Sequence, residues 1–91
     1  MAEVIQPYTN PSYIGNSVSV GFNVELKNKV YLFVFNQDGI GPCLYSIYKN
    51  PNEYQSIKLC GEGNAVITIN GSIANLKGSG DYGGHGFVVG L

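Results

Sequence analysis

The fold is decided by one central stretch, Val30-Tyr31-Leu32-Phe33-Val34-Phe35-Asn36-Gln37-Asp38-Gly39, in which six apolar residues run without a break and stop at a turn signal. β-Branched and aromatic side chains dominate this run, and it is too short for a buried helix. The stretch therefore predicts a strand that is covered on both faces and lies in the middle of a layered β-structure.

Further alternating or apolar runs lie on both sides of this strand, separated by turn residues and without a helical period. The polar segment Lys27-Asn28-Lys29 predicts a tight turn that joins the preceding alternating run to the central strand as a hairpin. Asn70-Gly71 predicts a second hairpin, because both residues accept the positive φ of a tight turn. The expected strands are residues 17–26, 30–35, 43–48, 54–60, 65–69, 72–76 and 87–89, with a glycine-rich loop over 78–86.

About seven short strands with turns every 8–12 residues predict an all-β fold, an antiparallel Ig-like sandwich or a small barrel. Residues 1–16 are expected to be an extended N-terminal arm with at most a short strand, and residues 17–91 a single β-sandwich domain. The expected core residues are Val18, Val20, Phe22, Val24, Leu26, Leu32, Val34, Leu44, Ile57, Leu59, Ile67, Ile69 and Val88.

Charge is sparse in this chain, with five lysines, six acidic residues and no arginine. The charged fraction of 12% is about half of the usual quarter. Two interpretations stay open: a neutral face that contacts a partner or another copy, or a glycine-rich β domain that simply carries few charges. Without arginine or a basic patch, no nucleic-acid partner is expected.

No apolar segment approaches the roughly 20 residues that cross a bilayer, so no membrane insertion is expected. The start of the chain, residues 1–7, lacks the basic and apolar regions of a signal peptide. Either the protein stays inside the cell, or a start codon precedes a mature secreted form. The composition leans toward a secreted, cell-surface or virion-associated protein.

Four pieces carry a resemblance to a known family: the central stretch with the alternating strand before it, Leu44-Tyr45-Ser46-Ile47-Tyr48, Asn50-Pro51-Asn52, and Gly78-Ser79-Gly80-Asp81-Tyr82-Gly83 before a final strand. From Ser17 onward the chain resembles a bacterial accessory β-sandwich module, a domain family of unknown function that is attached to peptidases and envelope lipoproteins. The resemblance implies an Ig-like sandwich with a binding or accessory role near the cell envelope. It implies no site residues.

Cys43 and Cys60 are the only cysteines, and they fall at the two open ends of one expected hairpin. A disulfide between them would close a loop of about 17 residues and add roughly 3 kcal/mol of stability. The alternative is a pair of buried free thiols that act as small hydrophobic side chains.

Catalytic and cofactor motifs are weak. Cys43 or Cys60 with His85 and Asp81 formally makes a nucleophilic set, but nothing in the sequence places a cysteine beside the histidine. The same residues are too few and wrongly spaced for a metal site. Residues 78–83 match G-x-G-x-x-G, yet no helix is expected after them. We therefore expect no enzyme activity, no cofactor and no bound metal.

Tyrosine is the most informative positive feature, because it gives contact area at low entropy cost. The candidate interaction surface consists of Tyr8, Tyr13, Tyr48, Tyr54 and Tyr82. The leading hypothesis is a non-enzymatic structural or interaction module that forms a homo-oligomer or docks on a protein partner. The alternative is a lectin-like module that binds a glycan through tyrosines with amide side chains beside them.

Overall fold

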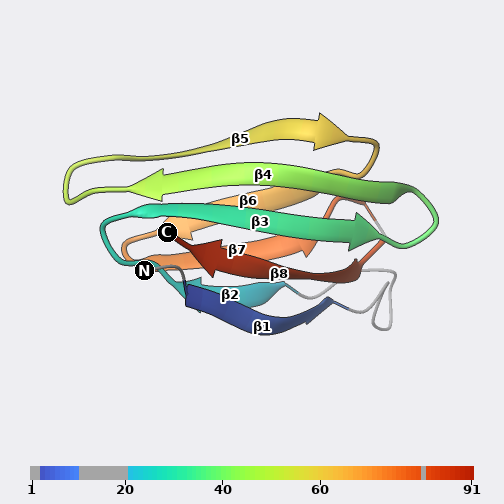
Figure 1. Cartoon of the computed structure of the whole chain (residues 1–91), viewed down its shortest axis with the longest axis horizontal. Coiled ribbons are helices and arrows are strands. Elements are labelled where there is room, and N and C mark those ends of the chain that lie inside the picture. Colours follow the sequence, from blue (N-terminus) through green and yellow to red (C-terminus); the bar gives the residue numbers. More distant parts are fainter. Residues whose placement is uncertain (1–2, 11–20, 81) are drawn as a thin grey trace.

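Eight strands form two antiparallel sheets in the computed structural model, which describes residues 21–80 and 82–91 and, as backbone only, residues 3–10. The strands are β1 (Glu3–Asn10), β2 (Phe22–Glu25), β3 (Val30–Gln37), β4 (Gly41–Lys49), β5 (Tyr54–Gly61), β6 (Ala65–Asn70), β7 (Ile73–Gly78) and β8 (Gly84–Gly90). The larger sheet has the order β1-β8-β3-β4-β5 and the smaller sheet the order β2-β7-β6 (Figure 1). The all-β antiparallel sandwich is confirmed, with eight strands in place of about seven.

The central strand β3 lies in the middle of the larger sheet, between β8 and β4, as the sequence predicts. Tyr31, Phe33 and Phe35 point inward and are fully buried. Leu32 and Val34 point to the opposite face and are only half-buried. The prediction that protein covers both faces of this strand is wrong for the described residues, because the smaller sheet covers the inner face alone.

The core between the sheets combines aromatic residues of the larger sheet with aliphatic residues of the smaller one. Phe33 and Phe35 stack with ring centroids 5.4 Å apart. The buried hydroxyl of Tyr45 accepts a hydrogen bond from the Ala65 N–H at 2.8 Å and donates one to the Ala65 carbonyl at 3.3 Å, so it joins β4 to β6 across the core. The buried cluster contains Val24, Leu26, Tyr31, Phe33, Phe35, Cys43, Tyr45, Ile47, Ile69, Ala74, Leu76 and Val88.

The predicted core is correct for the smaller sheet and for β8 but wrong for three strands of the larger sheet. The correct residues are Val24, Leu26, Ile69 and Val88, which are buried, and Phe22 and Ile67, which pack against them. Leu32, Val34 and Leu44 lie instead on the outer face of the larger sheet, because the opposite set of side chains on β3 and β4 turns inward. Ile57 and Leu59 on β5 are 46% and 53% exposed, because β5 is an edge strand. Val18 and Val20 lie outside the described residues.

The turn at residues 27–29 carries the chain from one sheet to the other. β2 pairs with β7 in the smaller sheet, whereas β3 belongs to the larger sheet, so the predicted hairpin between them is wrong. Both strands bury one apolar face, and the two faces meet across the core. The Lys27 N–H donates to the hydroxyl of buried Tyr31 at 2.6 Å, which anchors this crossing.

The hairpin predicted at Asn70-Gly71 is confirmed between β6 and β7. Asn70 pairs with Ile73, so the loop consists of Gly71 and Ser72, and Gly71 has a φ of 65°. The glycine-rich loop is shorter than expected, because β8 already begins at Gly84. A Cβ atom on Gly86 would collide with the Val34 carbonyl oxygen, so glycine is what lets β8 approach β3 closely.

Residues 3–10 of the expected N-terminal arm form β1, which pairs antiparallel with β8 at the edge of the larger sheet. The first and last described strands are therefore neighbours.

Gln37 is the one buried polar side chain of the described core and is 1% exposed. Its Nε2 group donates to the carbonyl oxygens of Ser79 at 3.0 Å and Tyr82 at 3.1 Å. Its Oε1 atom accepts from the Asn64 N–H at 2.8 Å. The side chain therefore ties the end of β3 to the β5–β6 and β7–β8 loops.

Candidate functional site

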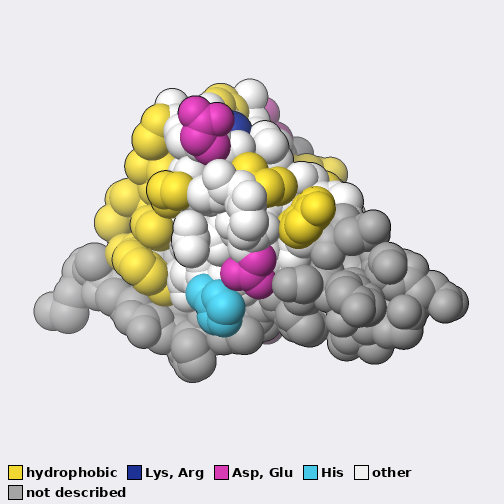
Figure 2. Space-filling view, turned by 90° about the vertical axis from the view of Figure 1, so that its right-hand side faces the viewer, with side chains coloured by type: hydrophobic (Ala, Val, Ile, Leu, Met, Phe, Trp, Pro, Cys, Tyr) yellow, Lys and Arg dark blue, Asp and Glu magenta, His cyan; other side chains and the backbone are white. Residues whose placement is uncertain are grey.

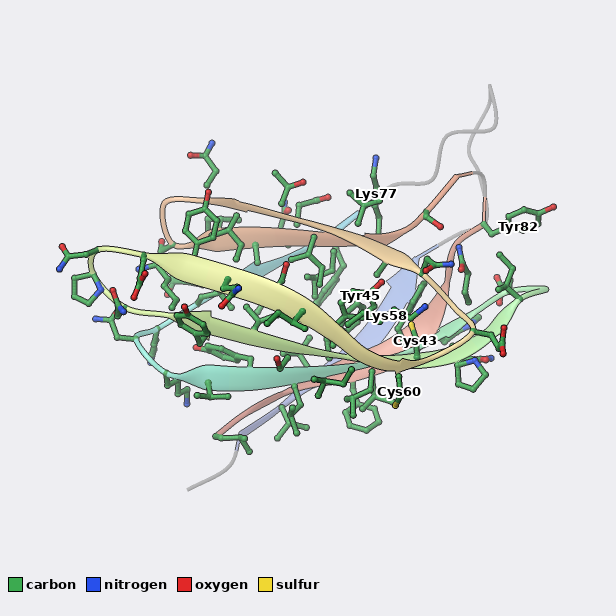
Figure 3. All side chains as sticks on the ribbon, turned by 90° about the horizontal axis from the view of Figure 1, so that it is seen from above. Cys43, Tyr45, Lys58, Cys60, Lys77 and Tyr82 are labelled. Carbon is green, nitrogen blue, oxygen red and sulfur yellow. The ribbon has the colours of Figure 1, made fainter. Side chains whose placement is uncertain are left out.

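The two cysteines face opposite sides of the larger sheet. In the register of β4 and β5, Cys43 lies opposite Gly61 and Cys60 lies opposite Leu44. Neighbouring positions along a strand point to opposite faces, so Cys43 turns into the core and Cys60 turns outward (Figure 3). Both are free thiols, and the predicted disulfide is not formed.

Cys43 has the properties of a core residue and not of a nucleophile. Burial raises the pKa of its thiol above 9.0, and the positive charge of nearby Lys58 offsets only part of this effect. A reactive cysteine needs the opposite change, because the thiolate is the nucleophile. The buried-thiol interpretation therefore holds for Cys43 alone, since Cys60 is exposed.

His85 lies on the outer side of β8 and not in a loop. Its Nδ1 atom is 3.7 Å from the Asp38 carboxylate. β3 and β4 separate it from Cys60 on β5, which is a distance of at least three strand spacings, about 14 Å. Asp81 lies outside the described residues. Within the part of the chain that the structure describes, no group of three His, Cys, Asp or Glu side chains could hold a metal ion.

The G-x-G-x-x-G match at residues 78–83 joins the end of β7 to the start of β8. The motif cradles a pyrophosphate only where it opens a helix, and here a strand follows. Within the described residues there is also no helix long and apolar enough to span a membrane.

The candidate tyrosines do not form one surface among the residues that the structure describes. Tyr48 is half-buried on the outer face of β4, and its register partner there is Gln55. Tyr54, opposite Lys49, points to the other face of the same sheet. Tyr82 lies in the β7–β8 loop at the far end of the sandwich (Figure 3). The side chain of Tyr8 on β1 is not described, and Tyr13 lies outside the described residues.

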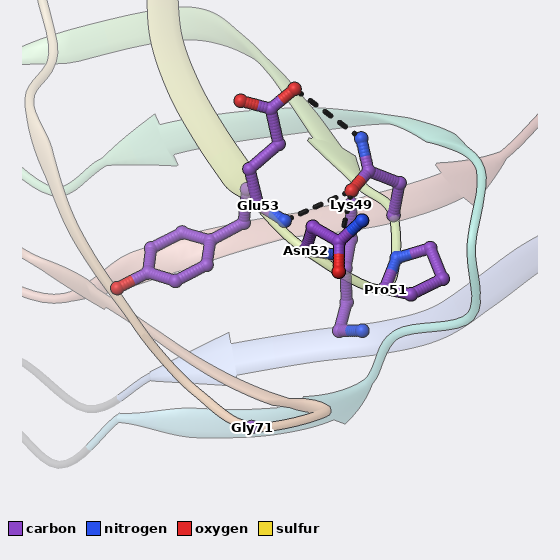
Figure 4. Close-up of a pocket in the computed structure, with 7 residues that line it drawn as sticks. Lys49, Pro51, Asn52, Glu53 and Gly71 are labelled. Atoms are coloured by element: carbon purple, nitrogen blue, oxygen red, sulfur yellow. Dashed lines mark hydrogen bonds between the residues drawn. The ribbon is translucent and has the colours of Figure 1, made fainter.

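Beside Tyr54 there is a small hollow at the β4–β5 turn (Figure 4). Its volume is about 220 Å³, below the 300 Å³ at which ligand pockets usually begin. The amide of Asn50 is occupied within the turn, since its oxygen accepts from the Asn52 and Glu53 N–H groups at 2.8 and 2.9 Å. The lining consists of Lys49, Asn50, Pro51, Asn52, Glu53, Tyr54 and Gly71.

An extended apolar surface lies on the side of the five-stranded sheet that faces away from the smaller sheet, and we call this surface the outer face. Strand register assigns to it Val30, Leu32, Val34, Leu44, Tyr48, Ile57, Cys60, Phe87 and Val89, with Asn36, Pro42, Ser46, Gln55 and His85 between them and at the ends. Hydrophobic side chains gather along this side of the molecule, at the left of Figure 2. None of the side chains described on this face is a lysine, aspartate or glutamate, and no described element lies over them.

Sequence reasoning placed four of these residues, Leu32, Val34, Leu44 and Ile57, in the core. The signal that could have identified the outer face is present in the chain, because β3 and β8 carry large apolar side chains at successive positions. Whichever set turns inward, the other forms an apolar outer surface.

β5 is a second unusual feature, because all eight of its residues are exposed. Among the described strands it pairs with β4 alone, and the smaller sheet ends at β6, so β5 projects beyond the described core. Lys58 on its inner side donates to the Asn64 side-chain oxygen at 3.0 Å and to no buried group.

Comparison of the chain with protein-family models, with curated proteins and with solved structures found no match.

Proposed function

We propose that this chain is a non-enzymatic structural or interaction module that self-associates or docks on a protein partner. The observation that carries the proposal is the outer face, on which six or more large apolar side chains adjoin one another without a lysine or acidic residue among the described ones. Monomeric soluble proteins seldom leave a contiguous apolar patch of this extent bare, and such patches are typical of contact sites.

Two further observations support this proposal over an enzyme. The thiol of Cys43 is buried with a raised pKa, and Cys60 and His85 lie on strands separated by two others. β5 also forms a sheet edge against which no other described strand lies, and a partner strand can extend such an edge.

Sedimentation velocity under reducing conditions tests the proposal. We expect particles heavier than one chain at high protein concentration, with a fraction that rises with concentration. A chain that sediments as a monomer at every concentration, and that retains no protein partner from its source, would contradict the proposal.

The second candidate is a glycan-binding module, and the hollow beside Tyr54 is the observation that favours it. An exposed tyrosine ring next to the Asn52 amide offers stacking and hydrogen bonding to one sugar unit. A glycan array of the wild type and of Tyr54→Ala checks this function, with Tyr82→Ala as the matched control. Binding that Tyr54→Ala loses and Tyr82→Ala keeps would support it, and an array without hits would exclude it.

A further inference from the structure

We infer that the outer face is the contact between two copies of this chain, which pack sheet against sheet around a two-fold axis. The inference rests on the proposed function and names both the surface and the partner. It follows from three properties of the outer face: its charge, its shape and its area.

The charge of the face permits contact with itself. In a two-fold contact each residue meets the same surface on the other copy, so charged groups on the face would meet groups of the same sign. The described side chains of the outer face include no lysine, aspartate or glutamate. His85 is the one basic side chain among the described residues of the face, and it lies at one end of the face, beside the Asp38 carboxylate.

The shape of the face also suits a copy of itself. β-Sheets pack face to face about 10 Å apart with their strands nearly aligned. Leu32, Val34 and Leu44 project from the centre of the outer face, and smaller residues such as Ser46 lie between them. A second outer face could interdigitate with these side chains in the same way as an inner face.

The area is close to what a stable dimer needs. β3 has eight residues, and five strands at the usual spacing give a flat area of about 600 Å². The relief of the side chains adds to this figure. A standard interface buries roughly 800 Å² on each partner.

Cysteine cross-linking tests the contact directly. If the two-fold axis lies in the plane of the face and passes through its centre, the residues at the centre of one copy meet the same residues of the other copy. This holds whatever direction the axis takes in that plane. We therefore place a cysteine at Val34 by Val34→Cys in a Cys60→Ser background, and as a control Val66→Cys in the same background. Val66 is 41% exposed and lies on the outer side of the other sheet. On mild oxidation, we expect a covalent dimer from Val34→Cys and none from Val66→Cys.

Sedimentation of a charge variant gives a second measurement that does not depend on cross-linking. Leu44→Lys would bring two ammonium groups into an apolar contact, and we expect the dissociation constant of the dimer to rise roughly 100-fold. Val66→Lys should leave the dissociation constant unchanged.

The outcomes separate the inference from the proposed function. A wild type that associates, with a cross-link from Val66→Cys but not from Val34→Cys and no effect of Leu44→Lys, would overturn the face-to-face contact while self-association stands. A wild type that stays monomeric but retains a protein partner that Leu44→Lys releases would overturn the homodimer and keep the docking function. A monomer without a partner would overturn both.

Discussion

Replacing Gln37 with methionine should destabilise the protein strongly, although the two side chains are similar in size. Methionine has nearly the same volume and fits the same buried space, so the cavity term is small. The change removes the hydrogen bonds that the Gln37 amide donates to the carbonyl oxygens of Ser79 and Tyr82 and its longer bond to the Ser79 hydroxyl. It also removes the hydrogen bond that the amide accepts from the Asn64 N–H.

The expected loss follows from counting these groups. Leaving a buried donor or acceptor without a partner costs about 1–3 kcal/mol. The three backbone groups belong to loops that border on solvent, so we take the low end and expect a loss of about 3 kcal/mol. For a domain of this size, the melting temperature should then fall by roughly 12–24 °C.

Urea and thermal denaturation followed by circular dichroism measure this loss. Gln55→Met is the matched control, because it makes the same chemical change at an exposed position of β5 and should stay within about 0.5 kcal/mol of the wild type. Gln37→Glu adds a second check, because its carboxylate would face the two carbonyl oxygens that the amide now binds. The charged form is disfavoured in the folded state, so this variant should be more stable at mildly acidic than at neutral pH. A Gln37→Met protein as stable as Gln55→Met would show that the amide contributes nothing net, and the reasoning would fail.

Four further predictions rest on the described contacts. Gly86→Ala should lower the free energy of unfolding by about 3 kcal/mol, because its Cβ would collide with the Val34 carbonyl oxygen. At Gly80 a Cβ would meet open space and only the φ of 64° is unfavourable, so Gly80→Ala should cost about 1 kcal/mol. Urea denaturation measures both losses, and equal losses would refute the close approach of β8 and β3. Tyr45→Phe should lose about 1–3 kcal/mol, because the Ala65 N–H loses its partner, and Tyr48→Phe should be neutral; calorimetry that finds the two alike would contradict the bridge between the sheets. In the folded protein, diluted until it is monomeric, a thiol reagent should modify Cys60 at once and Cys43 only after unfolding, and rapid modification of both would contradict the burial of Cys43. Because burial raises the pKa of the Cys43 thiol, the unfolded chain loses this proton first; the free energy of unfolding should fall as the pH rises above about 9, and Cys43→Ala should lack this component.

Local pattern was sufficient to predict the class of fold and most of its elements. The apolar run at residues 30–35 predicted a strand in the middle of a sheet, and β3 lies between β8 and β4. Asn70-Gly71 marked a hairpin that exists, and all seven expected strands begin or end within a few residues of observed ones. These signals are local, because period-2 alternation and turn chemistry depend only on neighbouring residues.

The direction of side chains in the larger sheet was decided by tertiary structure alone. On β3, successive residues such as Leu32 and Phe33 are both apolar, so the pattern does not say which set turns inward. The aromatic side chains of β3 fill the space between the two sheets, and its aliphatic side chains are left on the outer face. Ile57 and Leu59 were predicted to be buried and are exposed. Alternation of apolar and polar residues does not distinguish an edge strand that projects beyond the core from a strand that is covered. The separation of the cysteines has a related cause: one residue of register puts Cys43 and Cys60 on opposite faces, and register belongs to the pairing of two strands and not to either strand by itself.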